Sequence, residues 1–171
     1  MKRYAAVLLI LLAAICVAGF QGAGEWIKFE SPQGLFSVLM PVQPTEQKGT
    51  TESPYGPYTT NLYLSKGKGE MYMAGWVDYD PKYTFEVQKE LEANRDNFAK
   101  AIKGTVGSTT PITFKGNPGI EFDGTTPDYA FRSRVYIVGK RPYMLVAAFP
   151  AGGEGAPNIN KFLSSFELTP K

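Results

Sequence analysis

The sequence predicts an α+β fold in which an antiparallel β-sheet is flanked by one long and one short helix. Two observations carry this prediction. Several short runs of β-branched and aromatic residues are separated by turns rich in Gly and Pro, and one long stretch changes to the helical period of 3.6 residues. A shorter helical stretch follows near the end of the chain. Runs of strands interrupted by a helix are typical of a sheet covered by helices.

The first predicted element is a hairpin of residues 26–29 and 36–40. The two runs are separated by Ser31-Pro32-Gln33-Gly34, where Pro and Gly stand as a reverse turn requires. Residues 41–57 follow with four prolines among Thr, Ser and Gly. Because proline cannot donate a ladder hydrogen bond, this segment is interpreted as an irregular surface loop.

A second hairpin is predicted from residues 58–65 and 70–79, joined by the glycine turn at 66–69. In its later strand, apolar residues occupy both alternating sets, Met71, Met73 and Val77 on one side and Tyr72, Ala74 and Trp76 on the other. A strand that is apolar on both faces is covered on both sides. We therefore place it near the centre of the sheet.

Residues 84–103 predict the long helix. One face carries Val87, Leu91, Phe98, Ala101 and Ile102, and the charged residues, Glu90 among them, fall elsewhere. Asn94 is a polar residue on the apolar stripe, so we expect a buried hydrogen bond from it to a neighbouring strand or loop. Gly104 is interpreted as the signal that ends the helix.

The rest of the chain predicts four more strands and the short helix. The third and fourth of these strands form a long hairpin, and the helix covers residues 157–165 after a Gly-rich connection. The strand candidates are residues 111–115, 119–123, 129–138 and 143–149.

The beginning of the chain has the pattern of a secretory signal. Two basic residues, Lys2 and Arg3, precede an almost wholly apolar run up to Phe20, and small residues follow. We predict a cleavable signal peptide at residues 1–23 and a single domain at residues 24–171, exported to the periplasm or the extracellular space. A retained membrane anchor is the alternative, and Ile15 before Cys16 argues against a lipid attachment site.

Composition removes several kinds of chemistry. The chain has no histidine, and its one cysteine lies in the predicted signal. Histidine general bases, thiol nucleophiles and thiolate or histidine metal sites are therefore excluded from the mature domain. Removing residues 1–23 leaves 16 basic and 16 acidic side chains, so no net positive field favours nucleic acid.

The remaining candidates for chemistry are carboxylates. Glu121 and Asp123 should share one strand face near Asp128 and could present oxygens to calcium, although surface carboxylates are the simpler interpretation. Asp78 and Asp80 resemble the start of a calcium loop but lack its glycine and final glutamate. We predict no metal and no cofactor.

Both ends of the predicted domain resemble PsbP-like domains. Ser31-Pro32-Gln33-Gly34-Leu35-Phe36-Ser37-Val38, with Met40-Pro41 and Pro44, is similar to their opening, and Lys161-Phe162-Leu163-Ser164-Ser165-Phe166 is similar to their terminal helix. These are core and turn residues. The resemblance implies a PsbP-like fold, an exported bacterial member and, by analogy alone, a non-catalytic accessory role.

The leading hypothesis is an accessory domain that binds another envelope protein, with Tyr55, Tyr58, Arg132 and Arg134 as candidate contacts. The alternative is a small-ligand or lipid-binding protein with a pocket between helix and sheet, lined by Met71, Met73, Trp76 and Phe98. An enzyme that uses carboxylates alone is a third reading, but no two acids are paired across an evident cleft.

Overall fold

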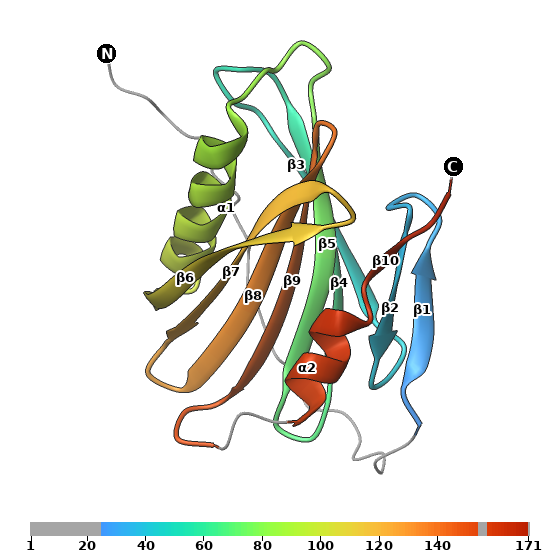
Figure 1. Cartoon of the computed structure of the whole chain (residues 1–171), viewed down its shortest axis with the longest axis vertical. Coiled ribbons are helices and arrows are strands. Elements are labelled where there is room, and N and C mark those ends of the chain that lie inside the picture. Colours follow the sequence, from blue (N-terminus) through green and yellow to red (C-terminus); the bar gives the residue numbers. More distant parts are fainter. Residues whose placement is uncertain (1–24, 154–156, 171) are drawn as a thin grey trace.

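The computed structural model describes residues 25–153 and 157–170, so the predicted signal peptide at 1–23 lies outside the described residues. Within them the chain forms two antiparallel sheets and two helices (Figure 1). The large sheet has seven strands. In spatial order they are β3 (Thr45–Thr51), β4 (Tyr58–Lys66), β5 (Met71–Tyr79), β9 (Arg141–Pro150), β8 (Tyr129–Val138), β7 (Asn117–Thr125) and β6 (Thr105–Phe114).

The large sheet is covered on one side by the first helix and on the other side by the small sheet together with the second helix. The small sheet consists of β1 (Ile27–Ser31), β2 (Phe36–Met40) and the short β10 (Glu167–Leu168). Helix α1 (Val87–Ala101) has 15 residues and packs on β6, β7 and β8, whereas α2 (Pro157–Ser164) has eight and packs beside the small sheet (Figure 1). No helix in the described part of the chain is both long and apolar enough to span a bilayer.

The period-two pattern of the central strand divides the core into two clusters. Met73 and Val77 of β5 belong to the cluster under α1, which we call the α1 face of the large sheet. Tyr72 and Trp76 belong to the cluster under α2 and the small sheet, which we call the α2 face. The prediction that this strand is central and covered on both sides is confirmed, because β5 lies between β4 and β9.

The prediction of an irregular loop at residues 41–57 is wrong in its middle part. Residues 45–51 form β3, an edge strand that pairs with β4 from Thr45 opposite Leu64 to Thr51 opposite Tyr58. The prolines flank this strand and do not interrupt it, since the nearest ones are Pro44 and Pro54. Because β3 carries polar side chains on both faces, no hydrophobic period marks it in the sequence.

Helix α1 ends slightly differently from the prediction. Its last helical residue is Ala101, and Lys103 takes the left-handed conformation with φ of 54°. Gly104 N–H donates to the carbonyl of Ala99 at 2.8 Å, and Lys103 N–H donates to that of Lys100 at 3.2 Å. This is the Schellman pattern, with a lysine where glycine is usual and Gly104 one position later.

Candidate functional site

Arg134 and Arg132, predicted to share one face of a strand, do so on the α2 face of β8, but their roles differ. The Nε of Arg134 forms an ion pair with Glu121 at 2.6 Å, and its Nη1 donates to the carbonyl of Leu163 in α2 at 3.1 Å. Arg134 thereby connects two strands of the large sheet to α2. Its donors are used to hold the fold together, so it is a poor candidate for a partner contact.

Arg132 lies two residues earlier and lines a groove of about 320 Å³. Among the described residues, its guanidinium makes no hydrogen bond and no ion pair within 4.0 Å. The groove is formed where β6 begins, β7 ends, β8 begins and β9 ends, and its walls include Thr105, Thr125, Ala130 and Phe149. In Figure 1 this end of β7 and β8 stands clear of α2.

Asp123 pairs with Arg132 across the β7–β8 ladder, but its carboxylate accepts hydrogen bonds from strand β6. Its Oδ1 accepts the backbone N–H of Ser108 at 2.9 Å, and its Oδ2 accepts the Ser108 hydroxyl at 2.8 Å. Ser108 can reach it because β6 has a register irregularity between Val106 and Thr109. The hydrogen bonds from Ser108, and then the charge of Arg132, lower the pKa of Asp123, so this carboxyl stays ionised.

The suggested calcium ligands are used otherwise. Glu121 is paired with Arg134 and Asp123 with Ser108. Asp78 accepts one hydrogen bond from Trp76 and one from Asn61, and it forms an ion pair with Arg141. The described residues contain no group of three or more metal-ligating side chains that could hold an ion.

The aromatic residues predicted as contacts are also split by the structure. Tyr55 is 48% exposed and packs against Tyr83 with the two rings tilted by 45° and their centroids 5.7 Å apart. Tyr58 is only 3% exposed and belongs to the core cluster of the α1 face. Tyr58 is therefore a core residue, and the prediction that it offers its ring at the surface is corrected by its place as the first residue of β4.

Tyr55 and Arg132 lie toward opposite ends of the sheet. Arg132 pairs with Ala147 of β9, which in turn pairs with Tyr72 of β5. Tyr58, which is close to Tyr55 in the sequence, pairs with Tyr79 at the other end of β5. Seven positions along a strand correspond to roughly 24 Å. The two candidate contacts therefore belong to two separate surfaces.

The pocket proposed for a small ligand does not form. Met73 and Phe98 belong to the core cluster of the α1 face, but Trp76 belongs to that of the α2 face. Neighbouring positions of a strand alternate between faces, so these side chains cannot line one cavity. The prediction is wrong because it combined both sides of one strand.

Glu90, placed outside the apolar stripe by the sequence, is only 5% exposed. Its carboxylate accepts a hydrogen bond from the Tyr79 hydroxyl and another from Asn94 Nδ2 at 2.9 Å. Asn94 is thus buried and hydrogen-bonded to Glu90 of its own helix, and its side chain also interacts with that of Tyr79 in the neighbouring strand β5. Burial raises the pKa of the Glu90 carboxyl, and the hydrogen bonds from Tyr79 and Asn94 offset only part of this rise.

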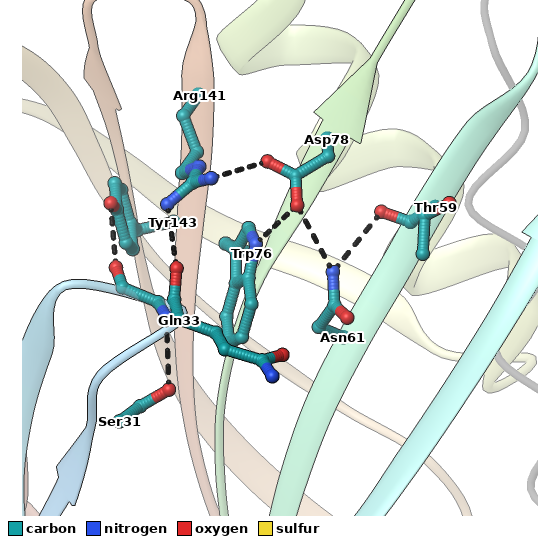
Figure 2. A network of polar contacts seen from close by, with 9 residues as sticks. Ser31, Gln33, Thr59, Asn61, Trp76, Asp78, Arg141 and Tyr143 are labelled. Carbon is teal, nitrogen blue, oxygen red and sulfur yellow. Dashed lines mark hydrogen bonds and ion pairs between the residues drawn. The ribbon is translucent and has the colours of Figure 1, made fainter.

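A second polar network holds the turn between β1 and β2 against the large sheet (Figure 2). Arg141 forms an ion pair with Asp78 at 2.6 Å and donates to the carbonyl of Gln33 at 3.1 Å. The Tyr143 hydroxyl donates to the carbonyl of Gly34 at 2.8 Å. Any Cβ on Gly34 would lie 2.6–2.7 Å from the rings of Phe36 and Trp76, so this position requires glycine.

Comparison with known proteins supports the fold. The chain is similar to the solution structure of cyanobacterial PsbP (CyanoP) from Synechocystis sp. PCC 6803, with a TM-score of 0.59 and 8% sequence identity. The match covers 90% of this chain and 98% of that one. No family model and no curated protein matches the sequence. The chain therefore has a PsbP-like fold, as its opening and closing residues predicted.

Proposed function

We propose that this chain is a non-catalytic, exported accessory domain that docks to another envelope protein through the open part of its α2 face. The observation that carries the proposal is the groove beside Arg132, on a part of the sheet surface that α2 leaves uncovered. There the sheet presents a guanidinium without an ion pair among the described residues, the ionised Asp123 and the ring of Phe149. Export rests on the predicted signal peptide.

The internal hydrogen bonds and ion pairs of the acidic side chains support a binding role over a catalytic one. Three of the acidic groups considered for chemistry have an internal partner: Glu121 has Arg134, Asp123 has Ser108, and Asp78 has Arg141. Carboxylates that hold strands and turns together are not free to work as a mobile acid and base pair. The PsbP-like fold points in the same direction by analogy.

The proposal is tested by cross-linking in cells that express the full chain with a C-terminal tag, followed by capture from the envelope fraction. We expect a specific protein partner with the wild-type chain and its loss with Arg132→Glu. Lys100→Glu, an exposed change on α1, is the matched control and should leave capture unchanged. Absence of any specific partner, or loss of capture with Lys100→Glu alone, would contradict docking through this surface.

A further inference from the structure

The two arginines of β8 differ in the hydrogen-bond and ion-pair partners of their guanidinium groups. A guanidinium carries five N–H donors and keeps its charge at all physiological pH values. Arg134 directs its donors to Glu121 and to the carbonyl of Leu163. Within the described part of the chain, Arg132 has neither a hydrogen bond nor an ion pair, although its side chain is partly buried in the groove.

The nearest acid does not take the place of the missing partner. Both oxygens of Asp123 already accept hydrogen bonds from Ser108. Asp123 influences Arg132 through space but remains beyond the 4.0 Å limit of an ion pair. The groove therefore keeps unused N–H donors beside a fixed negative charge.

That combination selects among anions. Asp123 repels any anion, but it repels a phosphate group, which carries about −1.5 to −2 charges at neutral pH, more strongly than a group of charge −1. A carboxylate carries one charge and matches the planar fork of a single guanidinium with two parallel hydrogen bonds. Among the described residues, no lysine and no second arginine lines the groove, which also favours a single charge.

The walls and size of the groove restrict what carries the carboxylate. Phe149 and Ala130 contribute apolar surface beside Arg132, and Thr105 and Thr125 are exposed at the rim. A volume of about 320 Å³ lies at the lower end of the roughly 300–1,000 Å³ of small-molecule pockets. It suits one acidic side chain and an adjacent apolar one better than a large ligand.

We propose that the groove beside Arg132 is a carboxylate-binding site that receives an acidic side chain of the docking partner, with a neighbouring apolar side chain of that partner packed on Phe149. This inference rests on the proposed docking function and names the chemistry that the partner presents. It also explains why the sheet keeps one arginine unpaired beside another that is fully engaged.

The test is an NMR titration of isotope-labelled protein produced from the full chain. The probe is a doubly blocked dipeptide of phenylalanine and glutamate, and the matched control is the same peptide with glutamine. We expect a weak complex with a dissociation constant of about 1 mM, with shifts confined to the amides of Gly107, Gly124, Thr125 and Arg132. The glutamine peptide should cause none of these shifts.

Two variants separate charge from geometry. Arg132→Gln should weaken binding at least about tenfold, since it removes a charge-assisted hydrogen bond, while Arg132→Lys should bind with intermediate affinity because it keeps the charge but not the fork. Both should retain the dispersed spectrum of the wild type, because Arg132 has no hydrogen bond and no ion pair with any residue that the structure describes. Equal binding of the two peptides, or unchanged binding by Arg132→Gln, would overturn the inference.

The capture experiment distinguishes this inference from the docking proposal. If Arg132→Gln captures the same envelope protein as the wild type, docking stands and the carboxylate site is overturned. If the glutamate peptide binds but no envelope protein is captured, the docking function fails and the site stands as a receptor for a free small carboxylate.

Discussion

The α1 face and the α2 face of the large sheet are built from the same strands but are stabilised differently. The α1 face is rich in aliphatic side chains and encloses one buried carboxyl, Glu90. The α2 face is dominated by aromatic rings, and it is joined to the small sheet by the polar network around Arg141. A sheet can therefore attach one covering layer mainly by aliphatic packing and the other by aromatic packing together with a polar network.

The largest expected effect comes from truncating one buried ring on each face. Phe36→Ala on the α2 face and Phe98→Ala on the α1 face should each cost about 3–5 kcal/mol of unfolding free energy. Phe36 should lie at the upper end because its ring packs against Phe29, Tyr63, Trp76, Tyr143 and Phe166, whereas Phe98 meets Phe122 and Phe131. Urea unfolding measures both. A larger loss for Phe98→Ala would reverse the comparison.

Removing one buried hydroxyl should lower the unfolding free energy on the α2 face but not on the α1 face. Tyr143→Phe removes the hydrogen bond to Gly34 and leaves a buried carbonyl unpaired, which should cost about 1–2 kcal/mol. The hydroxyl of Tyr58 is buried on the α1 side without a hydrogen-bond partner in the described residues. Tyr58→Phe should therefore be neutral or stabilising by up to about 1 kcal/mol. Thermal unfolding of both variants checks this, and equal losses would show that the Tyr58 hydroxyl has a partner.

The buried carboxyl makes the α1 face sensitive to pH. The pKa of Glu90 is raised in the folded chain, so its contribution to stability is fully present below the unfolded pKa and is lost as pH rises through the folded pKa. Glu90→Gln keeps an acceptor for Tyr79 and Asn94 but cannot ionise. We expect its stability relative to wild type to increase with pH over this window. Denaturant unfolding at a series of pH values measures the change.

The control for this prediction is Glu92→Gln on the same helix. The hydrogen bond that Glu92 accepts from Gln88 lies at the surface, so this variant should keep the pH dependence of the wild type. If Glu92→Gln and Glu90→Gln give the same profile, burial of Glu90 is not the cause.

The smallest expected effect is the difference in unfolding free energy between variants of the two arginines of β8. Arg134→Gln removes the ion pair with Glu121 and the bond to Leu163 and should cost about 1 kcal/mol. Arg132→Gln should change the unfolding free energy by less than about 0.5 kcal/mol, as is usual for a surface substitution away from internal contacts. A larger loss for Arg132→Gln would show that this residue supports the fold.

The helices and most strands could be predicted from local patterns. The two alternating apolar sets around Met73 and Trp76 identified a central strand, and the stripe containing Leu91 and Phe98 identified α1. Strand β3 was missed because its exposed polar residues have no apolar period. The site could be predicted only in part. Arg132 could be named as a candidate, but its groove depends on how the ends of four consecutive strands, β6 to β9, lie side by side in the sheet.

The order of the residues is enough to establish the periods of the elements, the positions of the main turns and the absence of histidine and of cysteine from residues 24–171. The folded chain was needed to find that Glu90 is buried, that Tyr58 is a core residue and that Arg134 forms an ion pair while Arg132 forms none with the described residues. The physical reason is that a period states which face of an element a side chain occupies. It does not state which distant element covers that face, and the partners of a polar group depend on that covering.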